Sequence, residues 1–196
     1  MHLSDYFHKS QALPPEYLRL GILEESIIKP LPEEEAKKVE IVRGPNIKFL
    51  PVPEVPVQHL KVPVSLKGGD NISTDDITPA SAEFSSMRSN IPLMSKYCYY
   101  RYDTEFSERA REMGSSIIIG GENYGQGSSR EHAAINPMYL GIKCVIAKSI
   151  PRIHKGNLVN HGIVPMLFED PADYEKVDLR DELEIEISWT RFQQGE

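Results

Sequence analysis

The residues whose types and spacing suit chemistry lie in a glycine-rich stretch, residues 120–132. An apolar run at 117–119 precedes the stretch, and Ser128, Ser129 and Arg130 lie near its end, before a helix-like segment. A strand that enters a loop and then a helix presents unpaired amides and a positive dipole end, which favour an anion. Because Arg130 adds a planar pair of donors, we predict a carboxylate- or phosphate-binding site here.

A serine in this stretch needs strong electrostatic help to act as a base, because its hydroxyl is a very weak acid. Free amides and a guanidinium nearby would supply that help, as in an oxyanion hole. His132 stands four residues after Ser128 and is an alternative hydrogen-bond partner for it. The simpler interpretation is a helix over residues 128–136 that Ser128 or Ser129 caps, with a surface pair of Arg130 and Glu131.

Three familiar motifs are missing from the glycine-rich stretch. The dinucleotide pattern lacks its third glycine, and the phosphate-loop pattern lacks its Gly-Lys-Ser/Thr. Gly-x-Ser-x-Gly is also absent, so the nucleophile elbow of hydrolases is not indicated.

A second polar segment, residues 68–79, places acids and hydroxyls close together, with an expected helix start at Ser73 or Thr74. Such a group could bind a metal. The calcium-loop pattern fails, however, because its glycine and its terminal glutamate are missing. We favour the alternative in which the Asp and Thr side chains cap turns.

Length and composition indicate one globular domain, or one domain with an appendage. The chain has 196 residues and a net charge of -7, which argues against a general nucleic-acid binder but permits a local site for small anions. Cys98 and Cys144 lack a C-x-x-C spacing, so we expect two buried, reduced thiols in a reducing cytosol or matrix, with a bridge as the alternative. Neither a membrane-spanning apolar run nor a signal peptide is visible.

The beginning of the chain is rich in proline, with nine of the fifteen prolines before residue 64. This spacing favours extended conformations and prevents a long helix. We therefore predict a partly extended linker or strap over residues 1–60, followed by one domain over residues 61–196. The apolar residues of the strap indicate that it docks on a larger surface, and the alternative is a flexible tail.

Strand-like segments recur along the domain, at residues 61–67, 115–120, 143–147 and 163–168. Pro63 suits an edge strand. Strands that alternate with helices through short connections predict a parallel sheet, which binds ligands at the carboxyl ends of its strands. Residues 183–189, ending at Trp189, alternate apolar and polar side chains and predict a half-exposed antiparallel strand.

The expected helices cover residues 103–113, 128–136 and 151–161. Gly114 and Gly162 stand just past the first and third of them, where glycine ends a helix. Pro137 is expected to break or kink the second helix, and Ser149 to cap the third.

Three separated blocks, residues 70–80, 121–134 and 149–165, resemble the C-terminal swivelling domain of the aconitase superfamily in sequence and in order. The resemblance extends over about residues 40–185. It implies an α/β fold, a three-layer β/β/α swivelling domain with a parallel central sheet and an additional antiparallel sheet. Asp76 departs from the family pattern, because histidine is common at its position.

The resemblance also implies a chemistry, the isomerisation of citrate to isocitrate by loss and return of water through cis-aconitate. By position, Ser128 would be the base that removes a proton from the carbon next to a carboxylate. Arg130 would neutralise that serine and the substrate, and Ser129 and Arg88 would bind carboxylates. The remaining polar positions in and around the substrate site would be Thr74, Asp75 and Thr78.

Aconitases hold a [4Fe–4S] cluster with three cysteines, and this sequence lacks them. Cys98 and Cys144 match no cluster motif, so no metal ligands are expected in this chain. The resemblance implies one part of an enzyme, inactive alone, that binds a tricarboxylate together with cluster-bearing domains. Those domains would belong to the same polypeptide or to a separate large subunit.

Two alternatives remain. The first is the small subunit of isopropylmalate isomerase or homoaconitase, which carries a Tyr-Leu-Arg-type loop. Residues 17–20 contain that string but lie far upstream, and the long 81–114 segment with Arg88 favours the aconitase type. The second is a noncatalytic module that binds carboxylates or RNA, although the acidic charge disfavours RNA. For all of these we expect a cytoplasmic location, or the mitochondrial matrix for a eukaryotic protein.

Overall fold

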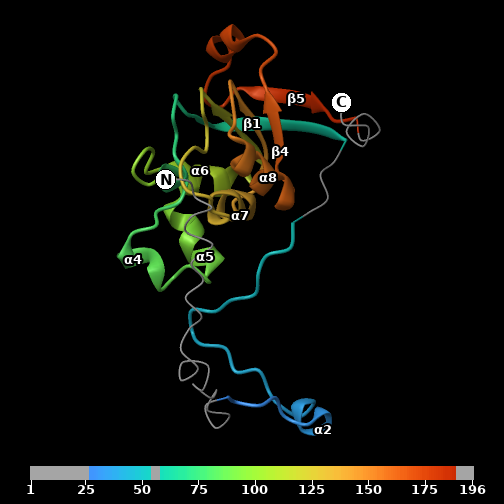
Figure 1. Cartoon of the computed structure of the whole chain (residues 1–196). Coiled ribbons are helices and arrows are strands. Elements are labelled where there is room, and N and C mark those ends of the chain that lie inside the picture. The colour runs from blue at the N-terminus through green and yellow to red at the C-terminus, as the bar shows by residue number, and fades with distance from the viewer. Residues whose placement is uncertain (1–26, 54–57, 189–196) are drawn as a thin grey trace, which may run out of the picture. The chain divides into compact units, whose positions relative to one another are not determined.

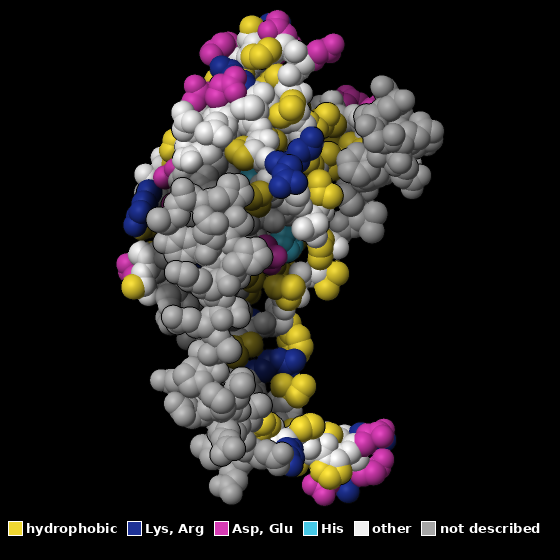
Figure 2. All heavy atoms as spheres, viewed as in Figure 1, with side chains coloured by type: hydrophobic (Ala, Val, Ile, Leu, Met, Phe, Trp, Pro, Cys, Tyr) yellow, Lys and Arg dark blue, Asp and Glu magenta, His cyan; other side chains and the backbone are white. Residues whose placement is uncertain are grey.

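The computed structural model describes residues 27–53 and 58–188 (Figure 1). The chain divides into two compact units, Met1–Val42 and Arg43–Glu196. In the described part of the first unit, a single short helix, α2 (Glu33–Ala36), begins with three glutamates, and Lys37 pairs with two of them. Acidic side chains gather over α2, and another acidic group lies around η4 (Pro171–Lys176) in the second unit (Figure 2).

Residues 27–53 contain no strand and expose most of their apolar side chains. Exposed examples are Ile28, Ile41, Val42, Phe49 and Val52. The proline spacing explains the absence of a longer helix in this segment. Docking of the strap on a larger surface stays a prediction.

The second unit is built on a five-stranded sheet in the order β4-β3-β2-β1-β5 (Figure 1). Its strands are β1 (His59–Lys67), β2 (Ser116–Gly120), β3 (Ile142–Ala147), β4 (Val164–Leu167) and β5 (Glu182–Glu186). The first four strands are parallel, and β5 pairs antiparallel with β1. The predicted α/β fold and antiparallel last strand are confirmed, and Trp189 lies outside the described residues.

Pro63 was expected in an edge strand, and this expectation is wrong, since β1 lies between β2 and β5. The pairing explains how proline is tolerated there. Pro63 is the last residue of β1 in register with β5, opposite Glu182, and the register with β2 begins one residue later at Val64. The missing amide therefore falls where β1 changes partners.

The main helices are α6 (Phe106–Met113), α7 (His132–Tyr139) and α8 (Arg152–Asn160). They pack on one face of the sheet, where Ile118 and Val145 meet Phe106, Ala134 and Leu158 (Figure 1). Ile117, Ile119 and Cys144 point to the other face and contact the segment after β4, including Phe168 and Tyr174. Because successive side chains of a strand alternate, β2 is buried on both faces.

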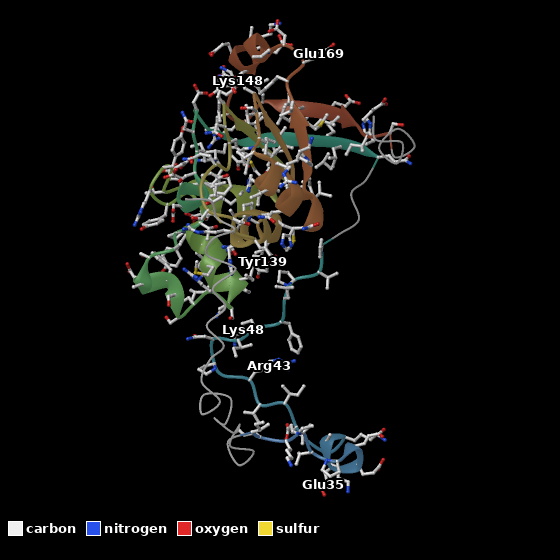
Figure 3. The ribbon with its side chains drawn as sticks, viewed as in Figure 1. Glu35, Arg43, Lys48, Tyr139, Lys148 and Glu169 are labelled. Atoms are coloured by element: carbon white, nitrogen blue, oxygen red, sulfur yellow. The ribbon has the colours of Figure 1, made fainter. Side chains whose placement is uncertain are left out.

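η4 packs on the second face of the sheet. Lys67 and Lys148 lie over the ring of Tyr174, at 5.0 and 4.4 Å from its centroid, and the Tyr174 hydroxyl donates to the Gly68 carbonyl at 3.0 Å. Lys148 and Glu169, which follow β3 and β4, lie at one end of the sheet, and Tyr139 of α7 lies toward the other (Figure 3). The carboxyl ends of the parallel strands therefore share one edge.

Both cysteines are free and buried, as predicted, and they lie in separate clusters on opposite faces of the sheet. Burial raises the pKa of Cys98 and of Cys144 to about 12. Both thiols are therefore protonated at neutral pH. None of the helices within the described ranges is long and apolar enough to cross a membrane.

The predicted glycines lie at the ends of two helices, whereas the predicted serine cap is not formed. Gly114 has φ +70° directly after α6. Gly162 closes a Schellman motif, in which its amide donates to Val159 at 3.0 Å and the Ile163 amide donates to Leu158 at 3.0 Å. The prediction that Ser149 caps α8 is wrong, because Pro151 occupies the N-cap.

The second helix differs most from its prediction. It begins at His132, four residues later than expected, and Pro137 lies inside it without ending it. Pro137 is the sixth residue of the helix, which continues to Tyr139. A proline near the end of a short helix removes only one interior hydrogen bond, and α7 is held by its buried apolar residues.

Candidate functional site

The glycine-rich loop after β2 is joined to the polar segment around residues 68–78. The Gly125 amide donates to Ile72 at 2.7 Å, and the Thr74 amide donates to Gln126 at 2.9 Å. Asp70 accepts from the Glu122 amide at 2.7 Å. A Cβ at Gly121 would lie 2.2 Å from the Asp70 carboxylate, so only glycine fits there. The two polar stretches identified in the sequence therefore form one structure.

The polar segment carries a short helix, α3 (Thr74–Ile77), with a complete capping box. The Ser73 hydroxyl accepts from the Asp76 amide at 3.1 Å, and the Asp76 carboxylate accepts from the Ser73 amide at 2.8 Å. The predicted helix start at Ser73 or Thr74 and the turn-capping role of this segment are confirmed.

Two buried threonines hold the loop in place. The Thr74 hydroxyl donates to the Ser128 carbonyl at 2.9 Å, and the Thr78 hydroxyl donates to the His132 carbonyl at 3.2 Å. Only 2% of either residue is exposed. Because both hydroxyls donate to backbone carbonyls, they fix the path of residues 128–132.

Ser128 and Ser129 were predicted to cap α7, and this prediction is wrong. Glu131 is the N-cap, without a side-chain hydrogen bond, and both serines are exposed in the preceding loop. Within the described part of the chain, the amides of Ser128, Ser129 and Arg130 have no acceptor. The serines are thus placed beside unpaired donors rather than used to satisfy them.

Arg130 forms an ion pair with Asp75 of α3. Its side chain is 23% exposed and that of Asp75 is 53% exposed, so the pair lies at the protein surface. Asp75 fixes the direction of the guanidinium next to the two serines. The guanidinium has further donors that this carboxylate does not use.

Two adjoining cavities meet at Ser129 and Arg130. The first, of about 280 Å³, is also lined by Thr74, Ser128 and the start of α8. The second, of about 300 Å³, is also lined by Thr78, Arg88 and His132. Every residue predicted for the site lines one of these cavities except Asp75, which contacts Arg130.

Arg88 enters the second cavity from the segment between the short helices α4 (Ala82–Ser85) and α5 (Ile91–Met94), which the 3₁₀ helix η3 (Ser95–Tyr97) follows. Its guanidinium donates to Ala80 at 3.2 Å, and its own carbonyl lies 3.0 Å from Nε2 of His132. The alternative in which His132 pairs with Ser128 is therefore wrong, because His132 holds the Arg88 backbone instead.

Sequence reasoning missed two residues of the first cavity, His154 and Asn157 of α8. His154 is 1% exposed, and burial lowers its pKa to about 4. Both of its ring nitrogens, and Nδ2 of Asn157, lack a hydrogen-bond partner among the described residues. Their spacing of three residues places both on one face of α8, next to the apolar Leu158. This pattern could have indicated that the two polar side chains face the interior.

Aromatic residues support the loop from below. The ring of Tyr124 lies 5.5 Å from that of His154, and the Tyr124 hydroxyl is hydrogen-bonded to the hydroxyl of Tyr99. Both tyrosines are buried, and burial raises the pKa of each well above its usual value. The pair therefore stays neutral and acts as a rigid support.

The described residues do not fit a [4Fe–4S] cluster. Within residues 27–53 and 58–188, no three His, Cys, Asp or Glu side chains are grouped so that they could hold a metal ion. The two buried cysteines lie on opposite faces of the sheet, with the pKa of each thiol raised to about 12.

The chain is similar in sequence to known proteins. Residues 88–171 match the family described as the aconitase C-terminal domain. The small subunit 2 of 3-isopropylmalate dehydratase from Archaeoglobus fulgidus is 40% identical over 121 residues, which cover 62% of this chain and 68% of that protein. The chain belongs to the aconitase C-terminal domain family.

Members of this family share the fold as well as the sequence. The crystal structure of 3-isopropylmalate dehydratase from Methanocaldococcus jannaschii matches with a TM-score of 0.56 and 32% identity, covering 65% of this chain and 71% of that one. The mitochondrial aconitate hydratase of Gracilaria gracilis is 52% identical over 69 residues, or 35% of this chain, but the match spans only 9% of that relative. By their names, these relatives are enzymes that add or remove water.

Proposed function

We propose that this chain is the serine-bearing small subunit of a hydro-lyase of the 3-isopropylmalate dehydratase type. The observation that carries the proposal is the convergence of Ser128, Ser129 and Arg130 on two adjoining cavities, with Arg88 in the second. The extent of the match supports a small subunit, because the chain covers 68% of the Archaeoglobus fulgidus small subunit.

Ser128 is the proposed base. Removal of a proton from the carbon next to a carboxylate produces negative charge, and the serine must carry a negative charge before it accepts the proton. The unpaired amides of residues 128–130 and the guanidinium of Arg130 provide positive potential at that point. Donors fixed in advance cost no reorganisation during the reaction, so this arrangement favours the ionised serine.

The substrate carboxylates are proposed to bind at the junction of the two cavities. Ser129 and Arg130 line both cavities, and Arg88 lines the second. Asp75 contacts Nη1 of Arg130, and the other donors of the guanidinium are proposed to bind a substrate carboxylate. Thr74 and Thr78 contribute by holding the backbone on which these groups lie.

The chain is expected to need a partner polypeptide. A hydro-lyase of this family would use a [4Fe–4S] cluster, and the described residues provide no site for one. We propose that a cluster-bearing large subunit supplies it and that this chain alone is inactive. The expected location is the cytoplasm, or the mitochondrial matrix for a eukaryotic source.

A second candidate is the C-terminal part of an aconitate hydratase acting on citrate and isocitrate. The identity to the Gracilaria gracilis enzyme, 52% over 69 residues, exceeds the 40% to the small subunit and favours this candidate. Arg88 in the second cavity also suits a substrate with a further carboxylate. The Tyr-Leu-Arg string at residues 17–20 lies outside the described residues.

Turnover by the assembled enzyme tests the proposal. The full chain is combined with a cluster-bearing large subunit, and the conversion of 2-isopropylmalate and of citrate is measured under anaerobic conditions. Conversion of 2-isopropylmalate is expected, conversion of citrate would favour the second candidate, and conversion of neither would contradict both. Tight RNA binding by the full chain at physiological salt would favour a noncatalytic module.

A further inference from the structure

We propose that His154 is a positioning residue for Ser128, acting through the backbone of Gly125. The inference rests on the proposed function, because it concerns the placement of the proposed base. His154 comes from α8, whereas Ser128 belongs to the loop after β2, and both line the first cavity. What links them is the position of the His154 ring beside Gly125, three residues before Ser128.

The imidazole occupies the space that a side chain at Gly125 would need. A Cβ built on Gly125 would lie 2.0 Å from Cδ2 of His154 and 2.6 Å from its Nε2. Gly125 has φ +81°, so its backbone already has a conformation that favours glycine. The ring of His154 therefore supports the loop three residues before Ser128, and a side chain at position 125 would displace either the loop or the ring.

The ring is also held from its second side. Tyr124, the residue before Gly125, packs its ring against His154, and Tyr99 fixes Tyr124 through their hydroxyl groups. At the far end of the loop, Thr74 holds the carbonyl of Ser128. The loop is thus fixed at both ends, by aromatic rings near Gly125 and by a hydroxyl at Ser128.

Packing alone does not explain why this residue is histidine. Both ring nitrogens are buried and lack a partner within the described residues, and burying polar atoms in this way costs stability. A phenylalanine ring is somewhat larger but has no polar atoms, so it would avoid that cost. We infer that the nitrogens take a hydrogen bond in the substrate complex, from a loop peptide group or from a water in the first cavity.

The inference predicts that a change at His154 affects the chemical step more than substrate binding. In the assembled enzyme, His154→Phe should lower kcat at least tenfold while KM changes less than threefold. The thermal midpoint of the full chain should change little, because the removal of two unpaired polar atoms offsets the cost of the larger ring. A kcat equal to that of the wild type would overturn the inference.

A conservative variant separates positioning from packing. His154→Gln retains a donor and an acceptor and should recover part of the lost kcat. If kcat and the thermal midpoint fall together in both variants, with no recovery in His154→Gln, the ring has only a packing role and the inference is wrong. Gly125→Ala should lower kcat more than His154→Phe, because it displaces the loop directly.

The same assay keeps this inference apart from the proposed function. Full activity in Ser128→Ala would contradict the proposed base and, with it, the role of His154. A Ser128→Ala enzyme without activity, beside a fully active His154→Phe enzyme, would contradict the positioning role alone.

Discussion

Serines stand at the beginnings of both α3 and α7, but they have different roles in the fold. At α3 the Ser73 and Asp76 side chains satisfy the first amides in a complete capping box. At α7 the two serines stand before the helix, its N-cap makes no side-chain hydrogen bond, and the preceding amides have no acceptor among the described residues. The capped start stabilises the fold, whereas the uncapped start leaves its donors free for a ligand.

Of the variants that test this comparison, Ser128→Ala should have the largest effect on kcat. If the uncapped start of α7 is a catalytic site, removal of its base should lower kcat by about 10²–10⁴-fold in the assembled enzyme. Stability should hardly change, because the Ser128 side chain is exposed and caps nothing. Steady-state kinetics and thermal melting measure the two effects, with Ser86→Ala, an exposed serine outside both cavities, as the control.

Arg130→Lys should have the next largest effect, about 10–10²-fold on kcat/KM. Lysine keeps the positive charge but loses the planar fork that holds Asp75 and a substrate carboxylate together. Arg111→Lys, an exposed arginine of α6, is the matched control. An Arg130→Lys enzyme with the kcat/KM of the wild type would show that charge alone is sufficient.

His154 should make the fold sensitive to acid. Its pKa is about 4 in the folded chain, below its ordinary value of 6.5, so the unfolded chain takes up the proton first as pH falls. The free energy of unfolding should therefore decrease between pH 6.5 and 4, by about 2–3 kcal/mol at pH 4.5. Urea denaturation should show that His154→Phe lacks this loss, whereas the exposed His59→Gln variant retains it.

Ser73→Ala should have the smallest effect and the opposite character to Ser128→Ala. Loss of an N-cap serine should lower the free energy of unfolding by about 1 kcal/mol, since the Asp76 amide loses its acceptor. The effect on kcat should be much smaller than in Ser128→Ala. A larger loss of kcat than of stability would show that α3 takes part in the reaction.

The strands were predicted well because strand burial leaves a strong pattern in the sequence. Ile117, Ile118 and Ile119 are buried on both faces of the sheet, and such a strand appears in the sequence as a short continuous apolar run. Antiparallel β5 alternates apolar and polar residues, since one face packs and the other is exposed. Pro63 was misplaced because a single sequence does not show where β1 changes partners.

The site was only partly predictable from the sequence. The glycine-rich stretch and the polar segment were recognised, but their joining depends on contacts across 52–54 positions, such as Asp70 with Glu122 and Thr74 with Ser128. The start of α7 was predicted four residues too early, because Ser128 and Ser129 are favourable caps by residue type alone. His154 was missed because its packing against Gly125 joins two distant parts of the sequence and is visible only in the folded chain.

The most direct test of the central claim is the exchange of the substrate C–H hydrogen with solvent deuterium in the assembled enzyme. NMR of 2-isopropylmalate and of citrate in D₂O reports proton removal separately from loss of water. With whichever substrate the wild-type enzyme converts, we predict exchange in the wild-type and Ser86→Ala enzymes and loss of exchange in Ser128→Ala. Exchange at the wild-type rate in Ser128→Ala would contradict the assignment of Ser128 as the base.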